Sequence, residues 1–182
     1  MDRRRLIATG LAAGAAALAV PASAFTLPVH LQPTRVAVRA AYAPGTIVVV
    51  PQTHFLYWID QPGAAMRYGV GVGRAGLEFQ GSATIRRKAE WPDWCPTDEM
   101  IERDPDSYAQ FADGVPGGPE NPLGSRALYL YQGNVDTYYR IHGTTAPRSI
   151  GRSVSNGCIR MLNAHVEDLY ERVPLGTRVV VL

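Results

Sequence analysis

Turn-forming residues are the sequence feature that most restricts the fold of this chain. Of its 182 residues, 18 are glycine and 14 are proline, and these residues interrupt helices and separate short strands. This pattern predicts many short elements joined by turns and favours a mostly β fold over a helix bundle. Hydrophobic residues make up 46% and charged residues 19% of the sequence, so the chain can form an apolar core, and intrinsic disorder is excluded.

The runs between these turns have the length and composition of strands. Seven runs are expected to be strands: 46–50, 53–59, 66–72, 84–88, 127–131, 137–141 and 177–182. Residues 97–103 predict a short helix capped by Thr97, and a second helix is predicted from Asn163 as its N-cap, with apolar residues at helical spacing. Residues 89–121 are irregular, and loops of this length are usually functional. We therefore predict one mostly β domain with one or two short helices.

The N-terminal segment has the three parts of a bacterial export signal. Residues 2–5 contain clustered arginines, residues 6–20 are apolar and rich in alanine, and residues 22–24 (Ala-Ser-Ala) form a cleavage site. The arginine pair resembles a twin-arginine signal. We expect cleavage of residues 1–24 on export to the periplasm or cell envelope, which leaves no stable membrane span; an uncleaved anchor is the alternative. Residues 25–44 are expected to be a leader strand or tether.

Charge and cysteine content argue against several classes of function. Cleavage of residues 1–24 removes three of the 18 basic and one of the 16 acidic residues and leaves 15 of each. The chain then has no positive excess to neutralise phosphates, and we expect no nucleic-acid partner. Two cysteines are too few for a disulfide scaffold or a four-cysteine zinc site. A zinc site at His142 and Cys158 lacks ligand pairs at the usual spacing, so we expect neither a metal nor a cofactor.

Cys158 is the first candidate nucleophile, because it lies in a tight polar turn of residues 154–160. Three consecutive backbone N–H groups around Gly157 and Cys158 are expected to form a concave nest, which lowers the thiol pKa and binds a developing oxyanion. Gly157 has no Cβ, so the backbone can approach a substrate carbonyl there. A small buried hydrophobic residue is the alternative role for Cys158.

His142 is the candidate base, because it ends a strong predicted strand that holds its ring rigidly. Gly143 follows it and offers a carbonyl that can accept the second ring N–H, so that Cys158, His142 and this carbonyl follow the logic of a nucleophile–base–acceptor triad. Cys158 follows His142 by sixteen positions, most of them loop, which allows the chain to fold back. The other histidines are expected in the leader, in a strand and on an exposed helix face (His30, His54 and His165).

Two motifs resemble the signature of bacterial L,D-transpeptidases with a YkuD domain. They are residues 141–144 (Ile-His-Gly-Thr) and residues 155–161 (Ser-Asn-Gly-Cys-Ile-Arg-Met). Two further stretches, residues 121–124 and 173–177, also resemble this family. The Trp-Pro-rich residues 91–97 resemble a loop of its ErfK-like branch. The resemblance covers residues 45–182, which implies a catalytic domain there with a β-sandwich-like fold.

The resemblance also implies a thiol acyltransferase that acts on peptidoglycan stem peptides. Cys158 would attack the carbonyl of meso-diaminopimelate in a tetrapeptide and expel the terminal D-Ala. The acyl group would then pass to an amine, which gives a 3→3 cross-link or a wall attachment. By the same resemblance His142 takes the thiol proton, Gly143 orients the ring, and the backbone N–H groups of Asn156, Gly157 and Cys158 form the oxyanion hole.

Arg160 and Ser155 are the expected substrate-binding residues. Arg160 matches the family's arginine two residues after the nucleophile, and its planar guanidinium suits a substrate carboxylate. An ordinary intramolecular ion pair is the alternative role for Arg160. Two alternatives to a transpeptidase stay open: a thiol carboxypeptidase or endopeptidase of the same fold that transfers to water, and a non-catalytic cell-wall-binding domain.

Two positions depart from the family pattern. Many relatives have histidine where this chain has Asn156, and relatives tend to have threonine where it has Cys95. Cys95 is expected to be a small packed residue. The alternative is a disulfide between Cys95 and Cys158, which an oxidising compartment would favour.

Overall fold

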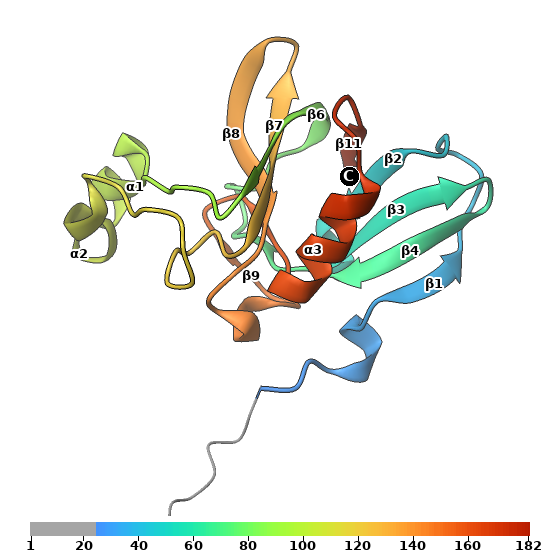
Figure 1. Cartoon of the computed structure of the whole chain (residues 1–182), viewed down its shortest axis with the longest axis horizontal. Helices are drawn as coiled ribbons and strands as arrows, with labels where there is room; N and C mark the ends of the chain where they lie inside the picture. Colours follow the sequence, from blue (N-terminus) through green and yellow to red (C-terminus); the bar gives the residue numbers. More distant parts are fainter. Residues whose placement is uncertain (1–24) are drawn as a thin grey trace, which may run out of the picture.

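The strands form one large sheet and one small sheet (Figure 1). The computed structural model describes residues 25–182. In spatial order the large sheet contains β1 (Thr34–Ala37), β4 (Ala64–Gly69), β3 (Phe55–Gln61), β2 (Thr46–Val50), β11 (Arg178–Val181), β6 (Gly81–Glu90), β7 (Arg126–Gln132), β8 (Val135–His142) and β10 (Ile159–Arg160). The small sheet pairs β5 (Val72–Gly73) with β9 (Ser153–Ser155). The predicted fold class, mostly β with few short helices, is confirmed.

Two valine-rich strands lie at the centre of the large sheet. β2 and β11 run parallel, with Val49 opposite Val181, and both residues are buried. Continuous apolar runs of this kind suit strands that are covered on both faces. The helix α3 (Asn163–Arg172) contacts β7 and β8, and its Val166 and Leu169 are fully buried. The sheet and α3 therefore share one hydrophobic core.

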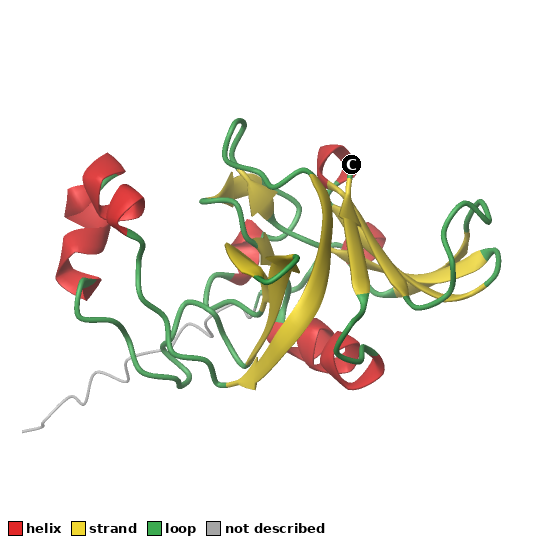
Figure 2. Ribbon diagram, turned by 90° about the horizontal axis from the view of Figure 1, so that it is seen from above, coloured by secondary structure: helices red, strands yellow, loops and turns green. Residues whose placement is uncertain are grey.

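The other α-helices belong to the long segment between β6 and β7. Here α1 (Asp98–Arg103), α2 (Pro105–Tyr108) and the 3-10 turn η3 (Ala109–Phe111) follow one another and bury none of their residues. The Thr97 hydroxyl accepts a hydrogen bond from the Met100 N–H, so the predicted N-cap of α1 is confirmed. Figure 2 shows α1 and α2 to one side of the strands, joined to them by long loops. The remaining 3-10 turns are η1 (Val29–Leu31), η2 (Pro51–Thr53) and η4 (Pro147–Ser149).

Two predicted strand boundaries are wrong, because turns replace strand residues. Pro51–Thr53 forms η2, and His54 has a left-handed φ of 57°. β3 therefore begins at Phe55, and His54 is a turn residue rather than a strand residue. The run predicted at 66–72 divides into β4, which begins at Ala64, and the separate strand β5.

Asn163 is not the N-cap of α3, which was the prediction. Leu162 occupies the cap position, and no side chain caps this helix. The Asn163 amide oxygen instead accepts hydrogen bonds from the Thr144 N–H at 3.0 Å and from the Ser125 N–H at 3.4 Å. Asn163 therefore ties the start of α3 to the turn that follows β8.

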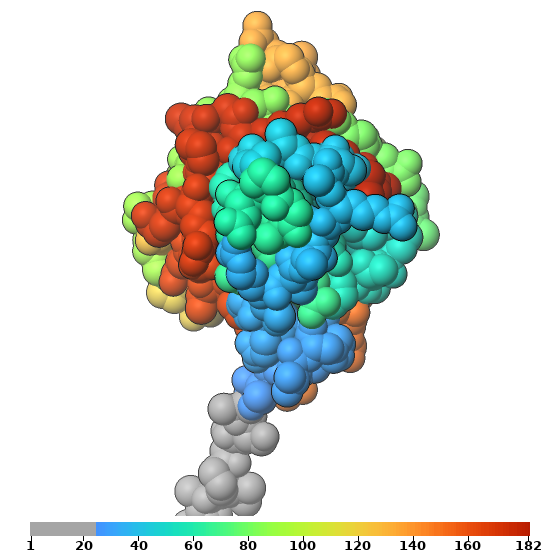
Figure 3. Space-filling model, turned by 90° about the vertical axis from the view of Figure 1, so that its right-hand side faces the viewer, coloured from blue at the N-terminus to red at the C-terminus, as the bar shows by residue number. Residues whose placement is uncertain are grey.

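Residues 25–44 lie against the edge of the large sheet. β1 pairs antiparallel with β4, and Leu27 and Leu31 are buried together with Ile150. In Figure 3 these early residues (blue) lie beside β3 and β4 (turquoise) on one face of the molecule. The predicted export signal, residues 1–24, lies outside the described residues. Among residues 25–182, no helix has both the length and the apolar character needed to cross a membrane.

Candidate active site

His142 and Cys158 are held by two neighbouring strands. His142 is the last residue of β8, and Cys158 directly precedes β10. The strands pair in parallel, with Arg160 opposite His142. Both candidate residues line one cavity of about 330 Å³. Its other lining residues come from the long segment, from the turn after β8 and from the turn around Cys158 (Trp94, Met100, Tyr108, Phe111, Val115, Glu120, Pro122, Leu123, Thr145, Ser155, Asn156 and Arg160).

The His142 ring is buried and held in one orientation. Its Nδ1 lies 2.6 Å from the Gly143 carbonyl oxygen. Because a carbonyl only accepts hydrogen bonds, Nδ1 is assigned the hydrogen and Nε2 the lone pair. Burial, reinforced by the charge of Arg160, lowers the pKa of His142 to about 4. The ring is therefore neutral at pH 7 and can accept a proton at Nε2. Any Cβ on Gly143 would collide with the Asn163 amide oxygen, so the acceptor position requires glycine.

The Cys158 thiol is half-buried and protonated at neutral pH. Burial raises the pKa of Cys158 against the opposing effects of the Arg140 backbone and of the Arg140 and Arg160 charges. Sγ donates a long hydrogen bond of 3.8 Å to the Tyr138 carbonyl oxygen. The expected lowering of the thiol pKa is therefore wrong for the free protein. Its resting pair is a neutral thiol and a neutral imidazole.

The turn before Cys158 is held by the Ser155 hydroxyl. This hydroxyl accepts a hydrogen bond from the Gly157 N–H at 3.1 Å and donates one to the Cys158 carbonyl oxygen at 2.6 Å. One of the three expected oxyanion donors, the Gly157 N–H, is thus used within the turn. The Ser155 hydroxyl is likewise engaged within the turn, and Ser155 also lines the cavity; its contact with a substrate stays a prediction.

Gly157 is required by packing, while the expected approach of a substrate at this residue stays a prediction. Its φ of 119° lies in the region that favours glycine. A Cβ there would collide with the ring of Tyr139 and with the Leu77 carbonyl oxygen.

Arg160 lines the cavity and forms no ion pair with an acidic residue among residues 25–182. Nothing in this part of the chain therefore supports the alternative role in an intramolecular pair. Burial lowers the pKa of Arg160, although a guanidinium keeps its charge at any physiological pH. A half-buried guanidinium facing a cavity is suited to binding a carboxylate.

The long segment between β6 and β7 forms one wall of the cavity and supplies eight of its lining residues. The Trp94 ring packs edge-on against Phe111 and Tyr108, at centroid distances of 5.8 and 6.3 Å. The Tyr108 hydroxyl accepts a hydrogen bond of 2.7 Å from Asn156 Nδ2, and Asn156 Oδ1 accepts one from Arg74. The Asn156 side chain therefore ties the nucleophile turn to α2.

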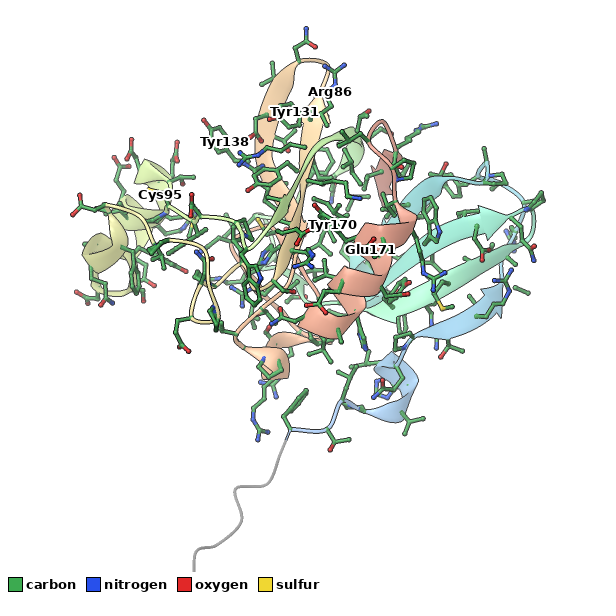
Figure 4. All side chains as sticks on the ribbon, in the orientation of Figure 1. Arg86, Cys95, Tyr131, Tyr138, Tyr170 and Glu171 are labelled. Carbon is green, nitrogen blue, oxygen red and sulfur yellow. The ribbon has the colours of Figure 1, made fainter. Side chains whose placement is uncertain are left out.

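Cys95 lies at a second cavity, of about 610 Å³, which shares Met100 and Asn156 with the first. Cys95 is exposed, and both cysteines are free thiols, so the prediction that Cys95 is packed is wrong. Its Sγ lies 3.5 Å from the Ala112 carbonyl oxygen. Cys95 and Ala112 both belong to the long segment between β6 and β7. Figure 4 shows Cys95 near α1, with Tyr138 on the neighbouring side of β8.

The other histidines lie away from the Cys158 cavity. His30 and His54 line a separate cavity beside the N-terminal residues. His165 is half-buried rather than on an exposed face, with its ring 6.3 Å from that of Tyr68. The structure therefore brings only His142, of the four histidines, to the candidate nucleophile.

Comparison with known proteins identifies the family. The profile of the L,D-transpeptidase catalytic domain (YkuD) matches residues 44–181. The chain belongs to this family. The probable L,D-transpeptidase ErfK/SrfK of Escherichia coli K12 is 35% identical over 144 residues, which are 76% of this chain and 44% of that protein. The probable L,D-transpeptidase YbiS of the same strain is 32% identical over 137 residues, or 74% and 43% of the two chains. The chain thus spans less than half the length of these curated relatives.

Solved structures agree with the L,D-transpeptidase fold. L,D-transpeptidase 3 of Mycobacterium tuberculosis is 18% identical, with a TM-score of 0.55 over 75% of this chain and 60% of that one; this likeness shows the fold. A Brucella melitensis structure described as a probable carnitine operon oxidoreductase is 60% identical, with a TM-score of 0.57 over 83% of this chain and 93% of that one.

Three contributors to the candidate site were missed in the sequence. The carbonyl groups of Leu123 and Tyr138 lie at the His142 ring and at the Cys158 thiol, and backbone groups leave no sequence motif. Arg140 pairs with Asp136 four residues earlier in the same strand. Opposite charges at this spacing within a predicted strand are the signal that could have indicated an irregularity next to the site.

Proposed function

We propose that this chain is an exported L,D-transpeptidase of peptidoglycan, acting in the periplasm or cell envelope. Its donor substrate is a stem tetrapeptide, and Cys158 attacks the bond between meso-diaminopimelate and the terminal D-Ala. The acyl group passes to an acceptor amine, which forms a 3→3 cross-link or attaches another molecule to the wall.

The proposed reaction begins from the neutral pair. His142 Nε2 takes the proton of the Cys158 thiol as Sγ forms a bond to the substrate carbonyl carbon, and backbone N–H groups of the turn bind the oxygen that becomes negative. The intermediate then breaks the bond to D-Ala, whose amine takes the proton from the imidazolium. In the second half, the acceptor amine attacks the thioester, His142 takes the amine proton, and the thiol is regenerated.

The strongest support is the arrangement of Cys158 and His142 at one cavity. The Gly143 carbonyl holds Nδ1, so the free lone pair of the ring is on Nε2, the atom a general base uses. Arg160 adds an ion-pairing group at the same cavity, and the stem peptide carries carboxylates for it to bind.

The two neighbouring cavities support transfer to an amine over transfer to water. They share Met100 and Asn156, so a second peptide has space beside the one attached to Cys158. A thiol carboxypeptidase or endopeptidase of the same fold is the alternative enzyme, and a non-catalytic wall-binding domain is the alternative without chemistry.

The oxidoreductase description of the Brucella protein does not extend to this chain in our proposal. Cys158 and His142 form a nucleophile–base pair for acyl transfer, and the family profile covers the whole region that holds them.

Mass spectrometry of the purified protein after incubation with a disaccharide-tetrapeptide tests the proposal. A cross-linked dimer, together with released D-Ala, is the expected product. A tripeptide without dimer would indicate the carboxypeptidase instead, and unchanged tetrapeptide would indicate the binding domain.

A further inference from the structure

Strand β8 is irregular next to the Cys158 thiol. Asp136 and Arg140, four residues apart in β8, lie opposite Tyr131 and Tyr129, which are only two residues apart in β7. This β-bulge therefore gives β8 two extra residues. Tyr138 lies at its apex with a left-handed φ of 60°, which is costly for an aromatic residue. Because Tyr138 is 70% exposed, burial of its side chain does not offset this cost.

Side chains of the same strand close the bulge. Arg140 Nη1 and Nη2 donate to the two carboxylate oxygens of Asp136, at 2.6 and 2.9 Å. The same carboxylate accepts a hydrogen bond of 2.8 Å from the Tyr138 N–H. Arg140 also stacks on the Tyr129 ring at 4.3 Å, and its side chain is 12% exposed. We call this pair the Asp136–Arg140 clasp.

The bulge contacts the nucleophile turn at two points. The Tyr138 carbonyl oxygen accepts the hydrogen bond from Cys158 Sγ. The Tyr139 ring occupies the space that a Cβ on Gly157 would need, and its hydroxyl donates to the Leu77 carbonyl oxygen at 3.1 Å. The strained bulge therefore sets where the thiol lies, and bulges are frequent beside active sites because they redirect local groups in this way.

We propose that Asp136 and Arg140 are positioning residues for the acyl transfer: their clasp locks the bulge so that the Tyr138 carbonyl orients the Cys158 thiol beside His142. This inference rests on the proposed function. A carbonyl oxygen accepts a hydrogen bond from a thiol but not from a thiolate. The single thiol hydrogen leaves the Tyr138 carbonyl oxygen when it turns to His142 Nε2, and the Arg140 backbone then stabilises the thiolate that attacks.

The charges around the thiol act together with this geometry. The groups that face Cys158 are Arg140, Asp136, Tyr139 and His142 of β8 and Arg160 of β10, with Tyr108 of α2 beside Arg160. Arg140 lowers the thiol pKa through its charge and its backbone, whereas Asp136 raises it. Loss of the Arg140 side chain is therefore expected to leave a less acidic and less well oriented thiol.

The pH dependence of Cys158 alkylation, compared between the wild type and Arg140→Met, tests the effect of Arg140 on the thiol without any substrate. After iodoacetamide treatment, trypsin places Cys158 in the peptide 153–160 and Cys95 in the peptide 89–103, so each thiol is measured separately. In Arg140→Met we expect the labelling midpoint to move to higher pH. We also expect kcat for transfer to fall about 10- to 100-fold at unchanged KM, as for loss of a charge-assisted hydrogen-bond pair. Arg172→Met is the matched control, because Arg172 also pairs with an aspartate four residues earlier, on α3.

Two further variants separate orientation from charge. Arg140→Lys keeps the charge but not the paired hydrogen bonds, so we expect its labelling midpoint near that of the wild type and its kcat as low as that of Arg140→Met. Full kcat in Arg140→Lys would overturn the positioning role. The positioning role would also be overturned if Arg140→Met had the labelling curve and kcat of the wild type, or if Arg172→Met lost as much kcat as Arg140→Met.

The fold of each variant is checked by circular dichroism. If the unpaired Asp136 carboxylate prevents folding of Arg140→Met, the double variant Asp136→Asn, Arg140→Met takes its place. Its kcat is expected to fall as in Arg140→Met, with a smaller shift of the labelling midpoint, because loss of the Asp136 charge lowers the thiol pKa. A wild type that labels normally but transfers no acyl group would contradict the proposed function, while the labelling curves would still show whether Arg140 acts on the Cys158 thiol.

Discussion

The strands that hold Cys158 and His142 differ sharply from the long segment that covers them. At the end of β8, Ile141 and His142 are buried, and main-chain pairing with β10 determines their position. In the long segment, by contrast, α1, α2 and η3 bury none of their residues. Main-chain pairing thus places the reactive groups, whereas a few side-chain contacts place the wall of the cavity. Changes in the strands should therefore alter the rate of the reaction, and changes in the segment should alter binding.

The two cysteines provide the sharpest test of this difference, since each region contains one. Cys158→Ala is expected to abolish acyl-enzyme formation and turnover, and Cys158→Ser should also fail because a hydroxyl is far less acidic than a thiol. Cys95→Ala, in the exposed segment, should retain most of the wild-type kcat. Intact-protein mass spectrometry and turnover measure both effects. More than a few per cent of wild-type turnover in Cys158→Ala would contradict the mechanism.

The next largest effect is expected at the base. His142→Ala should lower kcat about 10²- to 10⁴-fold, the usual contribution of a general base. His165→Ala is the control, because His165 lies on α3 away from the cavity. Steady-state kinetics of the folded variants decide between them. An unchanged kcat in His142→Ala together with a reduced kcat in His165→Ala would show that His142 is not the base.

These two regions also differ in how far they could be predicted. The His-Gly and Ser-Asn-Gly-Cys motifs, the strand pattern and the Thr97 cap are local signals, and local signals led correctly to the fold, the family and the meeting of His142 with Cys158. The direction of the thiol pKa shift could not be predicted, since it depends on burial by residues distant in sequence. The role of Asn163 was missed for the same reason: its partners lie in the turn after β8 and at the start of β7, which only the tertiary fold brings close.

Burial of His142 has a consequence for stability that the exposed segment cannot share. The pKa of His142 is about 4 in the folded chain and about 6.5 in an unfolded one. The unfolded state therefore gains a proton first as the pH falls, and stability is lost between pH 6.5 and 4, by about 3 kcal/mol at the lower limit. Urea unfolding of the wild type and His142→Gln at pH 7 and pH 4 measures this. An equal loss in both proteins would show that His142 is not its source.

Arg160 joins the two regions, because it belongs to β10 but faces the covered cavity. If it binds a substrate carboxylate through two parallel hydrogen bonds, Arg160→Lys should be nearly as harmful as Arg160→Ala, with KM raised about tenfold or more. KM and kcat for the tetrapeptide, measured for both variants, test this. Full activity of Arg160→Lys would show that only a positive charge is needed there.

The smallest expected effect is at the contact between the regions, where Tyr108 accepts its hydrogen bond from Asn156. Tyr108→Phe removes this bond but keeps the ring against Trp94, so α2 should be held less firmly over the cavity. One hydrogen bond contributes about 1 kcal/mol, which corresponds to a rise in KM of about fivefold, and kcat should be unchanged because the strands are not altered. Tyr131→Phe in β7 is the matched control, since Tyr131 lines a different cavity. A fall in kcat for Tyr108→Phe would show that the segment takes part in the chemistry and would remove the proposed division between the two regions.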